Sequence, residues 1–360
     1  MTPGAGEGLA LAADPAGPIA VSPESPGSDL RHLFRMSDDV GLFEHAEGAV
    51  PRREHGYCVD DVARGLVVLC REPFPSDAVV ELSGRYLTFL AHAQGADGGF
   101  HNRLGFDRRW HDRPETSDWW GRALWGLGTA VSDSPAPWIR DEALTVFERS
   151  ARRRTVHLRS TAFAGLGAAA VLAAHPSHLS ARELLRDAVT AIGAPADDPG
   201  WPWPQARLGY ANAVLPEVLI RAGRLLGDEA ALTRGLALLG WLVDRESTDG
   251  HFSPAPVGGR GPADERPGFD QQPIEVAALA DACAAAFAVT ADPRWEDGVH
   301  RAAAWFAGDN DASTVMSDPV TGGGYDGLTA TGRNANQGAE STLALLATRQ
   351  HDRRLRTEHP

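Results

Sequence analysis

The stretch AFAGLGAAA, Ala162–Ala170, is the part of the sequence that indicates the fold. Most of its residues are small on every side of a helix, so this helix has no broad polar face to present to solvent. Such a helix packs against other helices on all sides. A second stretch, from Ala277 to Ala286, has the same character. Both stretches therefore predict inner helices of an all-α protein.

The hydrophobic spacing from Tyr57 onward predicts inner and outer helices in alternation, with little strand signal. The inner helices carry small residues, and the outer helices carry more charge. We expect inner helices at 57–71, 117–131, 160–174, 210–226, 272–289 and 336–349, and outer helices at 78–94, 137–152, 178–192, 228–244 and 293–306. Pro216 fits its helix only if that helix begins close to it.

The links between these helices alternate in length. Links from an inner helix to the next outer helix are short, whereas most links in the other direction are long. Long loops inside a compact domain are usually functional, and these would all lie at one end of the helical hairpins. The long links are 95–116, 193–209, 245–271 and 307–335.

Six hairpins closed in a ring need twelve helices, and the segment from Ser28 to Met36 can supply the twelfth. We therefore predict a single domain over residues 28–350, an (α/α)6 toroid with its long loops on one rim. Residues 1–27 lack the charged start and apolar run of a signal peptide and predict a disordered arm. Residues 351–360 predict a charged, frayed tail. No later stretch approaches the roughly 20 apolar residues of a membrane span.

The composition excludes several classes of function. The net charge of −14 argues against nucleic acid, because that ligand requires a basic stripe. All 34 basic residues are arginine, so no lysine can serve a Schiff base, a P-loop or a kinase site. Three cysteines without a CxxC pair predict reduced thiols and a cytoplasmic protein.

The segment HGYCVDDVAR, His55–Arg64, places two adjacent carboxylates and an arginine at the start of an inner helix. Asp60 or Asp61 can cap that helix. The loop before it is also crowded with polar residues, including Asp39 and His45. A structural helix start needs no such group, so we favour a ligand site.

Carboxylates recur at or near the starts of the inner helices, at Asp60, Asp61, Asp118, Glu217, Glu275 and Glu340. Each can simply complement the helix dipole, for about 0.3–1 kcal/mol. As a set they would converge on one cavity, where two carboxylates can act as general acid and general base on a sugar. Asp118 also stands beside Trp119 and Arg122, and a buried salt bridge is the alternative explanation for that arginine.

The long loops carry aromatic residues beside Asp, Gln and His, in the segments 97–101, 201–205, 249–252 and 323–327. Asp-Gly turns with an aromatic plug explain part of this pattern. A sugar site needs the same residue types, because a pyranose has an apolar face and a rim of hydroxyls. The segments 269–275 and 333–340 add amides and carboxylates suited to hydroxyls.

A metal site is the weaker interpretation. The chain has no HExxH, no HxH and no cysteine pair with zinc spacing. Asp38-Asp39 with Asp60-Asp61 could hold calcium, but we expect neither a metal nor a cofactor.

The paired helices, DGGF-like loops and rim carboxylates resemble the (α/α)6 toroid glycosidases, including unsaturated glucuronyl hydrolases, and their N-acylglucosamine 2-epimerase relatives. The segments 39–46, 56–64 and 117–125, with Pro51, are most similar to a bacterial domain commonly labelled a glycosyltransferase. That domain occurs alone or C-terminal to a sugar-nucleotide transferase, and near mannoside phosphorylases. The resemblance implies a functional association with one of these enzymes. The sequence lacks the twin Rossmann halves of a nucleotide-sugar transferase, so the transferase label does not transfer.

The leading hypothesis is a glycoside hydrolase acting on an oligosaccharide, with Asp61 and Asp118 as the catalytic pair and Glu340 or Glu275 in reserve. Aromatic residues would stack on sugar rings, and polar residues would bind hydroxyls or an acidic group. The expected binding residues are Asp39, His45, His55, Asp60, Arg64, Trp119, Arg122, Trp203, Gln205, Asn212, Phe252, Asp270, Gln272, Arg333 and Asn334. A sugar epimerase or isomerase of the same fold and a non-catalytic glycan-binding partner of a glycosyltransferase stay open.

Overall fold

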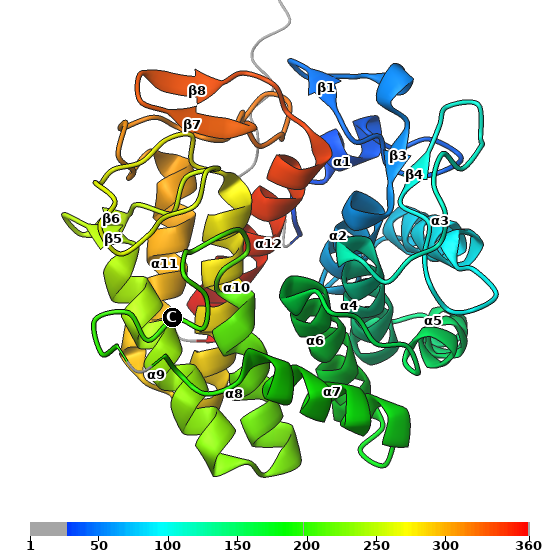
Figure 1. Cartoon of the computed structure of the whole chain (residues 1–360). Coiled ribbons are helices and arrows are strands. Elements are labelled where there is room, and N and C mark those ends of the chain that lie inside the picture. Colours follow the sequence, from blue (N-terminus) through cyan, green and yellow to red (C-terminus); the bar gives the residue numbers. More distant parts are fainter. Residues whose placement is uncertain (1–26, 197, 359–360) are drawn as a thin grey trace, which may run out of the picture.

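The computed structural model describes residues 27–196 and 198–358, and twelve α-helices lie in these ranges (Figure 1). The predicted arm lies almost wholly outside them. All eleven helices predicted from Tyr57 onward are confirmed, with their ends shifted by a few residues except at the C-terminus. The helices are α1 (Arg31–Arg35), α2 (Val59–Cys70), α3 (Asp77–Ala93), α4 (Asp118–Asp133), α5 (Pro137–Ser150), α6 (Leu158–Ala174), α7 (Leu179–Ile192), α8 (Val214–Leu226), α9 (Glu229–Arg245), α10 (Pro273–Thr290), α11 (Pro293–Ala307) and α12 (Ala339–Glu358).

The six inner helices form a closed ring. Each of α2, α4, α6, α8, α10 and α12 contacts the next one, and α12 contacts α2 again. Every inner helix also packs against one outer helix, and the short α1 completes the sixth pair with α12. Figure 1 shows the inner helices around the centre and the outer helices outside them. The predicted ring of six hairpins is therefore confirmed.

Small residues let the inner helices approach closely. A methyl group on Gly167 of α6 would overlap the carbonyl oxygen of Leu124 in α4, and one on Gly128 would overlap the carbonyl oxygen of Gly167. At the start of the same pair, Gly121 lies equally close to the backbone of Ser160. The backbones of α4 and α6 thus touch directly, which explains the glycines at these positions; the larger side chains of the AFAGLGAAA stretch, Phe163 and Leu166, face the axial cavity instead.

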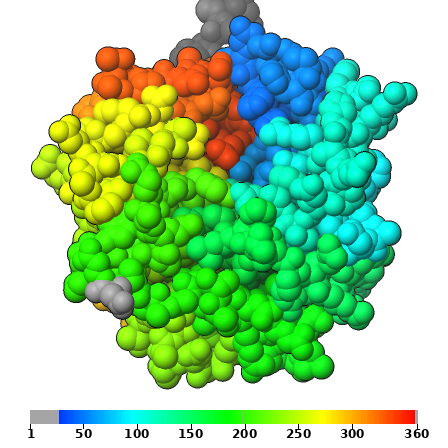
Figure 2. Space-filling model, in the orientation of Figure 1, coloured from blue at the N-terminus to red at the C-terminus, as the bar shows by residue number. Residues whose placement is uncertain are grey.

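The long links and the segment between α1 and α2 contain four antiparallel two-stranded sheets, which the sequence did not predict. They are β1 (Ala46–Glu47) with β2 (Val50–Pro51), β3 (Tyr57–Cys58) with β4 (Arg103–Leu104), β5 (Ser247–Thr248) with β6 (His251–Phe252), and β7 (Gly327–Thr329) with β8 (Gly332–Asn334). Asp249 and Gly250 make the turn between β5 and β6 with positive φ angles, as expected for Asp-Gly. Figure 2 shows this face, where segments from both ends and the middle of the chain meet near its centre.

Two expectations about helices need correction. Residues 351–358 are not a frayed tail but continue α12, where Leu355 is buried and His351 bonds to Asp281 at 2.6 Å. By length and hydropathy alone, α10 is apolar enough to cross a membrane, which the sequence analysis overlooked. It is an inner helix of the ring and is 67% buried, which accounts for its apolar surface.

We predict that Gly167→Ala destabilises the protein by about 2 kcal/mol or more, because the added methyl group forces two backbones apart. This cost exceeds the roughly 1 kcal/mol gained from the higher helix propensity of alanine. Urea unfolding measures the difference as a lower midpoint. Gly258→Ala is the matched control, since no atom lies within 4 Å of its added methyl group. Equal midpoints for Gly167→Ala and the natural protein would contradict the close-packing account.

Candidate active site

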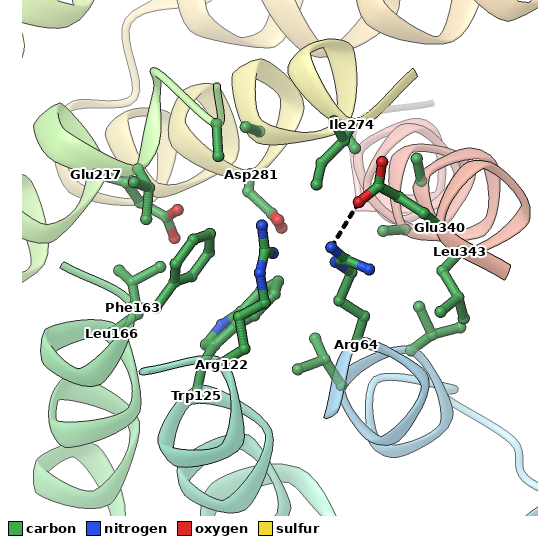
Figure 3. A pocket seen from close by; sticks show the side chains of 18 residues that line it. Arg64, Arg122, Trp125, Phe163, Leu166, Glu217, Ile274, Asp281, Glu340 and Leu343 are labelled. Atoms are coloured by element: carbon green, nitrogen blue, oxygen red, sulfur yellow. Dashed lines mark hydrogen bonds and ion pairs between the residues drawn. The ribbon is translucent and has the colours of Figure 1, made fainter. Parts of the chain in front are cut away.

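A cavity lies on the axis of the ring, enclosed by the inner helices (Figure 3). Its wall includes residues from all six inner helices. Arg64, Arg122 and Glu340 stand at one end, and an apolar belt that includes Trp125 and Phe163 follows below them. Because the inner helices begin at this end, the acidic residues of their first turns are brought to the same place.

The aspartates at the start of α2 do not cap it. Cys58 is the N-cap residue, and no side chain bonds to the free amides there. Asp61 is instead almost buried, with 3% of its surface exposed, and accepts a hydrogen bond from Arg64. Arg64 also donates to Glu340 of α12 at 2.6 Å. One guanidinium thus joins carboxylates from two inner helices across the ring.

Asp60 makes a looser contact. Its Oδ1 lies 3.2 Å from Nε of Arg122 in α4 but accepts no hydrogen bond. Arg122 is itself buried, and its guanidinium lies 4.2 Å above the ring of Phe163. Burial lowers the pKa of Arg122 to about 10, so it stays charged at neutral pH. Asp60 is therefore the carboxylate of α2 with bonding capacity left for a ligand.

Asp118 begins α4 and is half-buried. It accepts a hydrogen bond from the hydroxyl of Tyr210, in the loop before α8. Burial raises the pKa of Asp118, while the nearby Arg122 opposes that rise. Arg122 of the same helix pairs with Asp60 instead, and the hydrogen-bond donor to Asp118 comes from another hairpin.

The site holds more acids than bases. Four carboxylates, Asp60, Asp61, Asp118 and Glu340, surround the guanidinium groups of Arg64 and Arg122, and Arg159 adds a third, weaker positive charge near Asp118. In a buried setting, excess negative charge favours binding of a proton. Burial raises the pKa of Asp61 to about 7, even with Arg64 against it. The cluster can therefore hold a carboxylic acid beside ionised carboxylates near neutral pH, which general acid and base chemistry requires.

Glu275 and Glu217 bind other residues and do not belong to the carboxylate cluster. Glu275 accepts hydrogen bonds from the backbone amides of Ala211 and Asn212 and from the side chain of Asn212 at 3.0 Å. These three donors satisfy the carboxylate, so Glu275 supports the loop before α8. Glu217 lies deeper in the axis, where it pairs with Arg221 at 2.7 Å. Neither stands with the cluster at the mouth.

Two expected stacking residues do not reach the cavity. Trp203 is buried and stacks on Trp241 at 5.9 Å between ring centroids. Phe252 is buried under Arg301. Both predictions are wrong in this structure, because these aromatic rings are packed in the core beneath the loops and expose no ring face to a ligand. Trp119 is half-buried and donates to the carbonyl of Phe100 at 2.6 Å.

The remaining predicted binding residues lie on or under the rim. Asp39 is exposed and pairs with Arg108 at 2.7 Å, so the surface ion pair explains it. The rings of His45 and His55 contact each other on the exposed side of the β1–β2 loop. Asn212 is buried and Gln272, the N-cap residue of α10, is half-buried. The exposed members of the set are Gln205, Asp270, Arg333 and Asn334.

Two aromatic residues that line the cavity, Trp125 and Phe163, and one that bonds to Asp118, Tyr210, were not predicted as site residues. The signal for Trp125 was available, because Asp118, Arg122 and Trp125 follow one another at i, i+4 and i+7 on one helix face. No comparable spacing marks Tyr210, which lies in a loop.

A metal ion fits the site poorly. Ligand atoms of Glu44, Cys58 and Asp61 lie within 4.8 Å of one another. Arg103 donates to Glu44 and Arg64 donates to Asp61, so guanidinium groups already neutralise both carboxylates. Burial also raises the pKa of the Cys58 thiol, which opposes the thiolate that a metal would need.

A second cavity, of about 1380 Å³, lies at the opposite end of the ring, among the C-terminal ends of the inner helices. Its deepest arginines are already paired. Arg71 donates to Asp281 at 2.6 Å, and Arg221 pairs with Glu217. This cavity is larger than the axial one, but size alone does not make it the better candidate for the active site. The carboxylates that outnumber the arginines lie at the other end of the ring, beside the long loops.

No family model and no curated protein sequence matches this chain. Solved structures do match in fold. A sugar epimerase from a ruminal bacterium has a TM-score of 0.68 and 12% identity, covering 92% of this chain and 95% of that one. The chain is an (α/α)6 toroid. Cellobiose 2-epimerase from Spirochaeta thermophila gives a TM-score of 0.65 with 15% identity over 91% and 93% of the two chains. An α-1,6-mannanase from a Salegentibacter species gives 0.61 with 9% identity over 90% and 96%.

Proposed function

We propose that this protein is a carbohydrate-active enzyme, and specifically a glycoside hydrolase that acts on an oligosaccharide. The fold is consistent with this proposal, since the similar structures include sugar epimerases and a mannanase. The mannanase structure is an inactive variant in which two consecutive aspartates are replaced by alanine. Asp60 and Asp61 are also consecutive, at the mouth of the axial cavity. The predicted association with a glycosyltransferase or a mannoside phosphorylase stays a prediction.

The observation that carries the proposal is the cluster of four carboxylates around two arginines. Hydrolysis of a glycoside requires a carboxylic acid to protonate the leaving oxygen and a carboxylate to activate water or attack the sugar. Asp60, Asp118 and Glu340 keep enough exposure to reach a substrate. Asp61 is enclosed by Arg64, so we now assign it to positioning Arg64 and to sharing the proton of the cluster.

An epimerase is the second candidate, because two of the three similar structures described above are sugar epimerases. Histidine is the usual residue for proton transfer between a carbon and solvent near neutral pH. No histidine is among the side chains that line the axial cavity. His157, which lies near Asp118, is the histidine in the described ranges that would have to serve. The carboxylate cluster therefore favours the hydrolase.

We predict that Asp60→Asn and Asp118→Asn each lower kcat by about 10²–10⁴-fold, the usual contribution of a general acid or base. The assay follows sugars released from a panel of oligosaccharides by NMR, beginning with manno-oligosaccharides. Asp141→Asn, an exposed change on α5, is the matched control and should retain full activity. Full activity in both site variants would show that neither Asp60 nor Asp118 is a catalytic carboxylate. Altered stereochemistry without bond cleavage would instead establish the epimerase.

The pH dependence offers a separate check. A general acid must hold its proton, so kcat/KM falls as pH rises through the pKa of the acid. Asp61 does not contact the substrate in this proposal, but it shares a proton with the catalytic carboxylates of the cluster, and burial raises its pKa to about 7. We therefore expect the rate to decline above about pH 7, measured over pH 4–9 at constant ionic strength. A rate that stays constant up to pH 9 would show that no cluster proton takes part.

A further inference from the structure

Tyr210 occupies a loop that is held from two sides. On one side, Arg159 of α6 donates to the carbonyl of Tyr210 at 2.7 Å and to the side chain of Asn212 at 3.0 Å. On the other side, Glu275 of α10 accepts from the amides of Ala211 and Asn212. Two inner helices therefore fix the backbone on either side of this one tyrosine.

The backbone at this point is also strained. Ala211 has a φ of +44°, in the left-handed region that residues with a Cβ atom rarely adopt. Such a conformation is unfavourable for a residue with a Cβ atom and persists only where surrounding contacts hold it. Asn212 closes the same turn, since its side chain accepts from the amide of Gly209 at 2.9 Å. Strain held in this way points to a function for the residue that the turn presents.

The presented group is the Tyr210 hydroxyl, which donates to Asp118. Two cations lie near the ring, with the guanidinium carbons of Arg122 at 5.9 Å and Arg159 at 6.0 Å from its centroid. These contacts fix the plane of the ring and therefore the direction of the hydroxyl. A structural tyrosine in a rim loop needs neither a strained turn nor an acceptor in the carboxylate cluster.

We propose that Tyr210 is a positioning residue that fixes the orientation and the ionised state of Asp118, so that Asp118 serves as the carboxylate partner in catalysis. This inference rests on the proposed function. A hydroxyl that donates to a carboxylate stabilises its charged form. The charged or titratable groups that face Asp118 are Asp60 of α2, Arg122 of α4, and His157 and Arg159 at the start of α6. Tyr210 is the neutral donor among these neighbours.

The test follows the titration of Asp118 directly. Protein labelled with ¹³C at aspartate carboxyl carbons is titrated by NMR, and the Asp118 signal is assigned from its loss in Asp118→Asn. Tyr210→Phe removes the donor, so we expect Asp118 to titrate at a higher pH than in the natural protein. Tyr57→Phe is the matched control, because that hydroxyl also donates to a carboxylate, Asp38 at 2.6 Å, which is not part of the cluster. An unchanged titration of Asp118 in Tyr210→Phe would overturn the proposal.

Two further variants separate positioning from simple loss of a hydroxyl. Glu275→Gln keeps the phenol but weakens the support of the turn, and should move the Asp118 titration in the same direction as Tyr210→Phe. Ala211→Gly tolerates the positive φ without strain and leaves both supports in place, so it should leave the titration unchanged. If Glu275→Gln does not fold, the comparison of Tyr210→Phe with Ala211→Gly still decides the matter.

Kinetics distinguish a failure of this inference from a failure of the proposed function. With a glycoside substrate, Tyr210→Phe should lower kcat by about tenfold or more, change KM less, and move the acidic limb of the pH profile upward. A shifted titration in a protein that cleaves no glycoside would refute the hydrolase and keep the role of Tyr210 toward Asp118. Cleavage with unchanged kcat and pH profile in Tyr210→Phe would refute the role of Tyr210 alone.

Discussion

The direct backbone contact between inner helices is the constraint on which the rest of the structure depends. Gly121, Gly128 and Gly167 let α4 and α6 meet without intervening side chains. The six inner helices enclose the axis, and their N-terminal turns converge at one end of it. Side chains that would be scattered over a wider ring are thereby brought into hydrogen-bond contact, as Arg64 and Glu340 are at 2.6 Å.

Convergence of the helix starts brings several carboxylates close together, and their mutual repulsion affects how the site holds protons. Carboxylates at helix starts are favoured one at a time, but several of them around a buried axis repel one another. Arg64 and Arg122 offset part of that repulsion by binding Asp61, Glu340 and Asp60. Burial, together with the carboxylates that remain uncompensated, raises the pKa of Asp61 to about 7.

Most of the architecture could be predicted from the sequence, because helix periodicity, small residues and link lengths are local properties. The convergence of Asp60, Asp61, Asp118 and Glu340 followed from the same reasoning. The uses of individual loop residues could not be predicted in this way. The role of Tyr210 depends on supports from two distant helices, and the burial of Trp203 depends on how its loop folds over the core. The same local pattern, an aromatic residue beside a polar one, is consistent with both outcomes.

The central claim is that the carboxylate cluster at the loop end of the axis is where a sugar binds and reacts. A crystal structure of the Asp118→Asn variant with a bound oligosaccharide tests it most directly. The account predicts a sugar ring at the mouth of the axial cavity, with a glycosidic oxygen within hydrogen-bond distance of Asp60 or Glu340. An oligosaccharide bound instead in the cavity at the opposite end, among Arg71 and Arg221, would contradict it.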